Sequence, residues 1–401
     1  MSTAQPIYAD NNATTAVAPE VVEAMQPFFG PEFYNPSSMY EPALSVAQAI
    51  KTARQTVATF LGAADPAEVL FTSCATESNN TAIFGVAAAN PSRKHILTSA
   101  VEHPSVLEVC KEMQRRGYEV TYLPVDRQGR ISTADYVRAL RPDTLLVSLM
   151  HANNETGVVW PVGEWARIAK ETDPRIVFHT DATQTAGKLP LDLSAEWPHV
   201  DLLSFSGHKM HAPKGVGVLY VRRGTPLRPY LLGGHQEGGR RGGTENVAYI
   251  AGLARACDLA VEHLPDMARI AALRDGLQDE LCRVISHVEI NGDAVERTPN
   301  TLNLSCHYIE GEAMLYELNG YGVYASTGSA CSSGSLEPSH VLKALGVPFT
   351  AMHGSIRLSF SAYTTAAEVK RIAEVFPLMV ASLRRMSPYW DQKNNCPRAT
   401  T

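Results

Sequence analysis

Short apolar runs alternate with stretches of helical periodicity between residues 68 and 221, and this alternation restricts the possible folds more than any other feature of the chain. Strands that alternate with helices build a mainly parallel sheet wrapped by helices. In such a sheet the ligand binds at the carboxyl ends of the strands. We therefore predict an α/β fold with a mainly parallel seven-stranded sheet, whose strands lie at residues 69–71, 96–99, 119–123, 145–150, 176–180, 202–205 and 216–221.

Polar residues follow several of these strands. The carboxyl ends of parallel strands share one edge of a sheet, so side chains placed just after them come together. Taken singly, His103 could be a structural histidine and Asn154 a turn residue. Unrelated polar residues would nevertheless have no reason to occupy this position repeatedly. One binding edge is therefore predicted to gather Thr76, His103, Asn154, Asp181 and Lys209.

Lys209 lies between two predicted strands in a segment with two glycines and a proline, which disfavour a helix, so we expect it on a loop. A surface lysine is the usual alternative. Here, however, the strand before Lys209 is apolar. Its neighbours Ser206, His208 and His211 are polar, unlike the charged residues that usually surround a solvent-exposed lysine. A lysine amine that is desolvated becomes a nucleophile able to form a Schiff base, and we predict that role for Lys209.

A lysine that forms a Schiff base with pyridoxal phosphate needs a carboxylate for the ring nitrogen and donors for the phosphate. Asp181 comes directly after an apolar strand and can keep the ring nitrogen protonated. The sequence TSCAT at 72–76 follows another strand and leads into a predicted helix, whose free N–H groups and hydroxyls would form an anion site. The sequence thus predicts a pyridoxal-phosphate site.

Cys331 differs from the other six cysteines because small, polar, turn-forming residues surround it at 326–335. A free thiol has a pKa of about 8.5, so a nucleophilic cysteine needs mobility and a nearby base or cation. We predict a reactive thiol here, with an oxidation-prone surface cysteine as the alternative. The remaining cysteines are Cys74, Cys110, Cys257, Cys282, Cys306 and Cys396, and we predict that most of them are small buried hydrophobes. The chain has no CxxC pair, so its cysteines indicate neither a disulfide framework nor a metal site.

After residue 244, two amphipathic helices follow each other without an intervening strand and mark the passage to a second unit. Further helices alternate there with predicted strands at 301–304, 323–325 and 355–360. We predict a large cofactor-binding domain at 16–262. A small α/β domain would comprise 1–15 and 263–401 and carry the cysteine loop at about 326–337.

Two further features favour anion binding. The segment 233–243 holds six glycines and two arginines before a predicted helix, and it is either a flexible linker or a loop that delivers donors to an anion. Arg357 is a single charge inside an apolar strand. Because an unpaired buried charge is costly, this arginine needs a carboxylate partner.

The composition is that of an ordinary globular chain: 401 residues, 45% of them hydrophobic and 19% charged, with a net charge of -6. This charge provides no basic surface for nucleic acid. The first residues lack the charged and apolar parts of a secretory signal, and no stretch approaches the roughly 20 apolar residues of a membrane span. We expect a cytoplasmic protein that binds neither nucleic acid nor a membrane.

In combination, these residues resemble the cysteine desulfurases of the NifS/IscS family, which are fold type I pyridoxal-phosphate enzymes. The resemblance extends from DNNATT at 10–15 to SPYW at 387–390, and its most specific parts are SFSGHK at 204–209 and TGSACSSGSLEPS at 327–339. Three motifs look closest to the nitrogen-fixation branch, NifS: KGVGVLY at 214–220, GGHQE at 233–237 and RGGTEN at 241–246. One departure is Tyr40, at a position where the family usually has a histidine.

The resemblance implies a reaction in which L-cysteine becomes L-alanine and the Cys331 thiolate takes the sulfur as a persulfide. It implies that Lys209 removes the Cα proton of the substrate and that His103 handles protons at the sulfur. It also implies that Arg357 and Asn154 bind the substrate carboxylate. The implied cofactor contacts are Lys209, Asp181, Gln184 at the ring hydroxyl, Ala75, Thr76, Asn154, Ser206, Gly207 and His208, with Thr244 supplied by the second subunit of a homodimer.

The implied sulfur acceptor is an iron–sulfur scaffold protein, which in the NifS branch serves nitrogenase, and housekeeping cluster assembly is the alternative role. Within the same fold, an aminotransferase would need no cysteine loop, and a selenocysteine lyase would act without Cys331. A non-catalytic sulfur carrier that uses only Cys331 is a further alternative, but it would leave Lys209 and Asp181 without a purpose.

Overall fold

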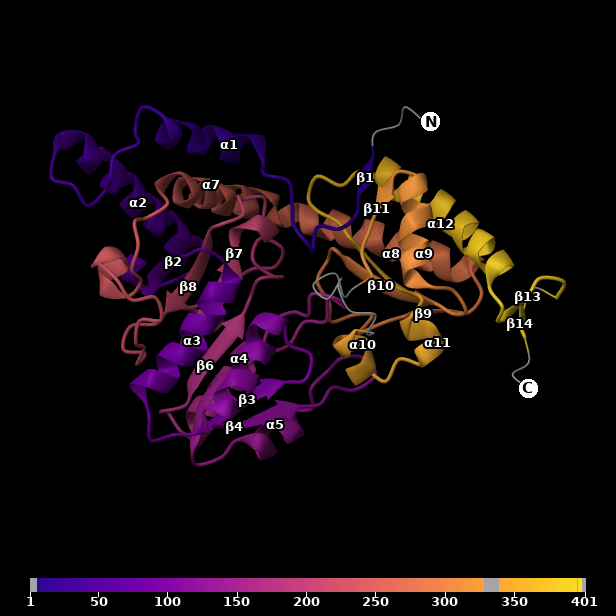
Figure 1. Cartoon of the computed structure of the whole chain (residues 1–401), viewed down its shortest axis with the longest axis horizontal. Helices are drawn as coiled ribbons and strands as arrows, with labels where there is room; N and C mark the ends of the chain where they lie inside the picture. Colours follow the sequence, from indigo (N-terminus) through magenta and orange to yellow (C-terminus); the bar gives the residue numbers. More distant parts are fainter. Residues whose placement is uncertain (1–5, 328–338, 395, 399–401) are drawn as a thin grey trace.

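A seven-stranded sheet lies at the centre of the larger part of the molecule in this computed structural model, which describes residues 6–327, 339–394 and 396–398 (Figure 1). Its strands are β2 (Val69–Thr72), β3 (His95–Ser99), β4 (Glu119–Leu123), β5 (Thr144–Ser148), β6 (Val177–Asp181), β7 (Leu202–Ser206) and β8 (Gly217–Val221). The strand order is β2-β8-β7-β6-β5-β3-β4, and all pairs are parallel except those of β8 with β2 and β7. The predicted α/β fold with a mainly parallel sheet is confirmed.

Helices cover both faces of this sheet, so successive strand residues enter two different cores. Leu202 packs in one core and Leu203 in the other, as the two-residue period of a strand requires. Because both faces are buried, the strands are apolar along their whole length. The first core contains residues of α3 (Ala75–Ala89) and α4 (Pro104–Arg115), and the second contains residues of α1 (Pro19–Met25), α2 (Glu41–Phe60), α5 (Thr133–Ala139), α6 (Val162–Thr172) and α7 (Val247–His263).

One strand, β5, ends earlier than we predicted. The run at 145–150 leaves the sheet after Ser148. The backbone N–H of Met150 then donates to both carboxyl oxygens of Glu102, each at 3.1 Å, instead of to a neighbouring strand. The end of β5 is therefore tied to the residue before His103.

A third core belongs to the C-terminal part of the chain, which lies to the right in Figure 1. Its sheet has the antiparallel order β12-β10-β9. In the described residues no helix combines the length and apolar character needed to span a bilayer. The elements of this part are α8 (Met267–Val284), β9 (Val288–Ile290), β10 (Thr301–Cys306), α9 (Gly311–Gly320), β11 (Val323–Tyr324), α10 (His340–Ala344), α11 (Phe349–Met352), β12 (Ser355–Ser359), α12 (Ala366–Met386), β13 (Trp390–Asp391) and β14 (Cys396–Pro397).

The predicted domain boundaries stay a prediction, but the buried side chains show two contacts that bear on them. β1 (Ile7–Tyr8) pairs in parallel with β11, so the N-terminal strand packs in the C-terminal core, as its assignment to the small domain requires. Val341 and Leu342 of α10 pack in the core of the large sheet. The chain after the cysteine segment thus contacts the large sheet directly.

The segment at 10–15 lies between the two parts of the molecule. The N–H of Asn11 donates to the carbonyl of Ser359 at 3.2 Å, at the end of β12. The N–H of Thr15 donates to the carbonyl of His208 at 2.9 Å, just after β7. One short stretch of backbone therefore connects the C-terminal sheet to the carboxyl edge of the large sheet.

Candidate functional site

A cavity of about 380 Å³ opens at the carboxyl ends of the strands of the large sheet, where ligands bind in folds of this kind. All five residues that follow strands in the sequence line it, as does Arg357 from the C-terminal sheet. The predicted site residues along its wall are Ala75, Thr76, His103, Asn154, Asp181, Gln184, Ser206, His208, Lys209 and Arg357. The structure brings these side chains together, and their individual roles stay predictions.

Lys209 ends a single 3-10 turn, Gly207–Lys209, that follows β7 directly. We expected a loop without helical structure; one turn forms because the N–H of Met210 donates to the carbonyl of Gly207 at 2.9 Å. Gly207 itself is not in the cavity wall, and a Cβ there would lie 3.0–3.1 Å from side chains of the core. The Nζ of Lys209 donates to the carbonyls of Asn12 and Ala13, both at 2.6 Å.

Asp181 is the last residue of β6, and only 6% of it is exposed. Its carboxylate accepts hydrogen bonds from Asn79 Nδ2 at 2.8 Å and from the N–H of Thr183 at 2.9 Å. The same Asn79 amide donates to Ser105 Oγ at 2.9 Å. Asn79 lies on α3, one helical turn after Thr76. This position on the helix is the only feature of the sequence that points to its contact with Asp181.

His103 is the N-cap of α4. Its Nδ1 accepts from the N–H of Ser105 at 3.1 Å and lies 2.8 Å from Ser105 Oγ. Ser105, which the sequence did not single out, therefore joins His103 to Asn79 and Asp181. Burial lowers the pKa of His103 from the usual 6.5, although the nearby Asp181 opposes this. A neutral imidazole at pH 7 is able to accept a proton.

Hydroxyl and N–H groups also line the cavity, and α3 begins in its wall shortly after β2. Ser206 Oγ and Thr183 Oγ1 are buried and have no hydrogen-bond partner among the described residues. Gly217 allows a close approach here, since a Cβ at this residue would lie 2.7 Å from the backbone carbon of Cys74. Burial, with the charges of three nearby lysines, lowers the pKa of His208 to about 4, so this imidazole is neutral at pH 7.

Arg357 reaches the cavity from β12, with 3% of its side chain exposed. The sequence predicted that its charge needs a carboxylate, and the structure supplies one that we did not anticipate: Asp10 Oδ1 lies 2.7 Å from Nη2. Nη1 donates to the carbonyl of Asn154 at 2.9 Å. The buried Nε has no hydrogen-bond partner among the described residues. The guanidinium is thus held in place by two of its five N–H donors.

Besides Gly207, one described site residue is not part of this cavity wall. Thr244 is exposed and lies outside it. Cys331 and nearly all of its predicted loop fall outside the described residues. Burial was predicted for most of the six other cysteines but holds for three, Cys110, Cys257 and Cys306, whereas Cys282 is exposed and the other two are partly buried.

The cavity has the features that pyridoxal phosphate needs. Lys209 supplies an amine, Asp181 a carboxylate for a ring nitrogen, and the unpaired hydroxyls of Ser206 and Thr183 supply donors for an anion. The first turn of α3 adds backbone N–H groups. Fold and site therefore define a pyridoxal-phosphate enzyme with a mainly parallel sheet.

Comparison with known proteins gives a family. Residues 7–372 match the sequence profile of the family described as aminotransferase class-V. The cysteine desulfurase NifS of Azotobacter vinelandii is 51% identical over 385 residues, which cover 96% of this chain and 95% of that protein. A cysteine desulfurase of Trichormus azollae is 50% identical, with the same coverage of both chains. The chain belongs to the cysteine desulfurases of the aminotransferase class-V family, whose members depend on pyridoxal phosphate.

Solved structures agree with this assignment. A NifS-like protein superposes with a TM-score of 0.88 at 38% identity, over 94% of this chain and all of that one. A second structure, described as SspA in complex with cysteine, has a TM-score of 0.78 at 36% identity and covers 90% of this chain and all of its own. The likeness therefore includes both the large sheet and the C-terminal part.

Proposed function

We propose that this chain converts L-cysteine to L-alanine and collects the sulfur as a persulfide on Cys331. One observation carries the proposal: an amine (Lys209), a carboxylate (Asp181), an imidazole (His103) and a guanidinium (Arg357) converge on one cavity from four separate segments. The relatives named cysteine desulfurase, and the similar structure described with bound cysteine, support the choice of substrate. Pyridoxal phosphate, when bound, supplies a ring that stabilises negative charge on the amino-acid carbon next to its amine.

Binding and orientation of the substrate fall to Arg357 and the adjoining backbone. Its guanidinium is already held by Asp10 and by the carbonyl of Asn154, so little side-chain freedom is lost when a carboxylate binds. Because Arg357 lines the cavity, the remaining N–H groups of its guanidinium are the donors that we assign to the substrate carboxylate. A substrate fixed at this end places its Cα toward Lys209.

Lys209 and His103 move the protons. Lys209 Nζ, when it is a free amine, accepts the Cα proton, and the carbonyls of Asn12 and Ala13 keep that nitrogen at the cavity wall. His103 handles the proton at the substrate sulfur: since Nδ1 accepts from the N–H of Ser105, the neutral imidazole carries a proton on Nε2 that it gives and takes back. Asp181, held by Asn79 and Thr183, presents its carboxylate to the ring nitrogen.

The sulfur transfer is a displacement at sulfur. The Cys331 thiolate attacks the substrate sulfur, an S–S bond forms, and the C–S bond breaks with its electron pair left on the substrate Cβ. Protonation of that carbon and return of the Cα proton from Lys209 complete L-alanine, and Cys331 carries the extra sulfur as a persulfide. No external oxidant is needed, because the carbon is reduced as the sulfur is oxidised.

The same proposal includes a homodimer, a scaffold acceptor and a cytoplasmic location. Thr244 is exposed at the end of a glycine-rich stretch, which supports a role for it at the phosphate of a second copy of the chain. The persulfide sulfur then passes to an iron–sulfur scaffold. The identity to NifS of Azotobacter vinelandii favours a scaffold that serves nitrogenase over one for housekeeping cluster assembly.

A comparison of two cysteine variants tests the reaction. We expect Cys331→Ala to keep the visible absorption of the bound cofactor but to release less than about 1% of the wild-type sulfide from cysteine under reducing conditions, because the attacking thiol is gone. Cys282→Ala is the matched control, since Cys282 is exposed but lies on α8, and it should keep full activity. Full activity of Cys331→Ala would refute the proposal.

A further inference from the structure

Lys188 is a buried lysine that the proposed reaction does not use. Only 7% of it is exposed. Its Nζ donates to the side-chain oxygen Oε1 of Gln184 at 3.0 Å and to the backbone carbonyl of the same residue at 3.2 Å. Among the residues that the structure describes, no carboxylate lies within 4.0 Å of this ammonium. A buried cation without a counter-charge is costly, so its presence beside the site needs a reason.

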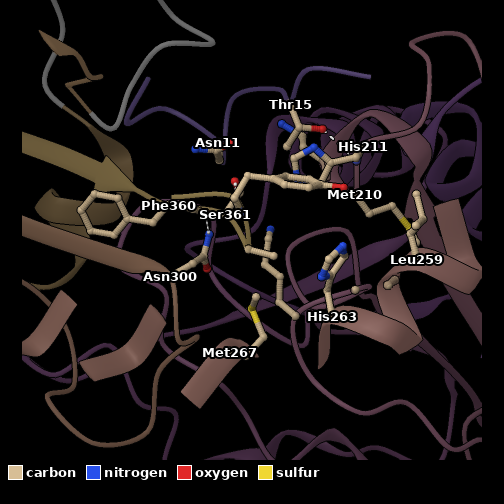
Figure 2. Close-up of a pocket in the computed structure, with 16 residues that line it drawn as sticks. Asn11, Thr15, Met210, His211, Leu259, His263, Met267, Asn300, Phe360 and Ser361 are labelled. Carbon is tan, nitrogen blue, oxygen red and sulfur yellow. Dashed lines mark hydrogen bonds between the residues drawn. The ribbon is translucent and has the colours of Figure 1, made fainter. Parts of the chain in front are cut away.

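A second, smaller cavity of about 40 Å³ lies on the other side of Lys209, and Lys188 borders it (Figure 2). Figure 2 shows His211, His263 and Asn300 around this space. The volume exceeds the roughly 10–15 Å³ that one water molecule needs. Lys188 therefore borders, together with Lys209, a space with room for a water molecule beside its charge.

The contacts of Lys188 determine how the Gln184 amide faces. An ammonium can only donate, so Oε1 must be the atom that points to Lys188. The amide nitrogen Nε2 then points the other way and donates to the carbonyl of Asn12 at 3.1 Å. That same carbonyl accepts from Lys209 Nζ at 2.6 Å. Three hydrogen bonds thus connect the two lysines through one amide and one carbonyl.

We infer that Lys188 is a positioning residue: it fixes the orientation of the Gln184 amide at the cofactor cavity and, through the shared Asn12 carbonyl, the place of the Lys209 amine. This inference rests on the proposed function, in which Gln184 contacts the cofactor. Gln184 lines the main cavity with only 6% of it exposed, so an amide in the reversed orientation would present an acceptor where a donor stands now.

Electrostatics agree with this placement. Burial, together with the charges of Lys209 and Arg357, lowers the pKa of Lys188 to about 7. At pH 7 the ammonium and amine forms of Lys188 are therefore both populated beside two other cations of the site, and the ammonium is the form that fixes the orientation of the amide. A lysine needed only to close the turn at 182–187 could do so from a solvated position.

That simpler role, a tie between Lys188 and the backbone carbonyl of Gln184, makes a different prediction. A tie of the turn would stabilise the fold whatever side chain residue 184 carries. A lysine that acts through the Gln184 amide would affect cofactor binding only while that amide is present. A double-mutant cycle separates the two roles.

The experiment titrates the apoprotein with pyridoxal phosphate and follows the visible absorbance in wild type, Lys188→Met, Gln184→Leu and the double variant. We expect Lys188→Met to raise the cofactor Kd about tenfold and to change the pH dependence of the absorption band, because a charged hydrogen bond that orients the amide is lost. In the Gln184→Leu background the same change should alter the Kd less than about twofold.

Lys170→Met is the matched control. Lys170 is also largely buried and donates to a backbone carbonyl, that of Ile176 at 2.6 Å, but it lies outside the cavity wall and pairs with Asp201. It should leave the Kd and the absorption band unchanged. If Lys188→Met does not yield folded protein, Lys188→Gln carries the same cycle.

Equal losses of affinity in both backgrounds, or no loss at all, would overturn the inference. Failure of the wild-type protein to bind the cofactor would instead overturn the proposed function, so the two failures are distinguishable.

Discussion

The ion pair between Asp10 and Arg357 allows a stability prediction that depends on the structure alone. Arg357 Nη2 lies 2.7 Å from Asp10 Oδ1, and the side chains are 3% and 18% exposed. Removing one partner of a buried pair leaves the other charge uncompensated and costs about 3–5 kcal/mol. Because Asp10 retains some contact with solvent, we expect Asp10→Asn to lower the free energy of unfolding by a little less, about 2–3 kcal/mol.

Thermal denaturation of the apoprotein at pH 7 measures this loss. A change of 1 kcal/mol shifts Tm by about 2–4 °C in chains of 150–250 residues and by less in a longer one, so a decrease of about 3 °C is expected. The control is Glu171→Gln, which breaks an exposed pair with Arg167 one helical turn away. That variant should change Tm by less than about 1 °C.

A cycle with Arg357→Met separates the ion pair from other effects of the substitution. Once Arg357 is replaced, no buried guanidinium needs the carboxylate, so Asp10→Asn should cost almost nothing in that background. The reasoning is refuted if Asp10→Asn destabilises the protein no more than Glu171→Gln does, or by the same amount with and without Arg357.

Two further outcomes follow from buried groups near the site. Burial raises the pKa of Glu102 from 4.5 to about 8, so its proton stabilises the fold fully below pH 4.5, and this contribution is lost as the pH rises from about 4.5 to about 8. Glu102→Gln should therefore flatten the decrease of Tm across that interval in thermal scans, and an unchanged slope would contradict the assignment. Ser206→Ala removes a buried hydroxyl without a partner, so apoprotein stability should stay equal or rise while the Kd of the cofactor increases several-fold; a loss of stability would show that the hydroxyl was already satisfied.

The sequence predicted those site residues whose position depends on the strand that directly precedes them in the chain. Lys209 and Asp181 were found because each follows an apolar strand, and parallel strands bring their carboxyl ends to one edge. The sequence pattern did not reveal that β8 is antiparallel to its neighbours. An antiparallel strand that is buried on both faces has the same apolar run as a parallel one. β5 begins one residue before and ends two residues before the predicted bounds. Its earlier end reflects the contact of Met150 with Glu102, which is tertiary and leaves no local pattern in the sequence.

The partners of the site residues were beyond local reasoning. Asn79 meets Asp181 across 102 residues, and Asp10 meets Arg357 across 347. No spacing rule connects such positions, and the need of Arg357 for a carboxylate was predictable while the identity of that carboxylate was not. The motif DNNATT at 10–15 was noticed for its resemblance alone, although it supplies Asp10, Asn12 and Ala13 to the site.

That motif explains how two separately packed parts can form one site. Asp10 pairs with Arg357 on the C-terminal sheet, and the Asn12 side chain donates to Thr301 Oγ1 at 2.8 Å on the same sheet. The backbone carbonyl of Asn12 accepts from Lys209 and Gln184 on the large sheet. Because two residues of one short turn segment make all of these contacts, that segment links the guanidinium of Arg357 to the amine of Lys209 independently of the packing between the two cores. A loosened contact between the cores would therefore leave this link intact as long as the segment keeps its hydrogen bonds.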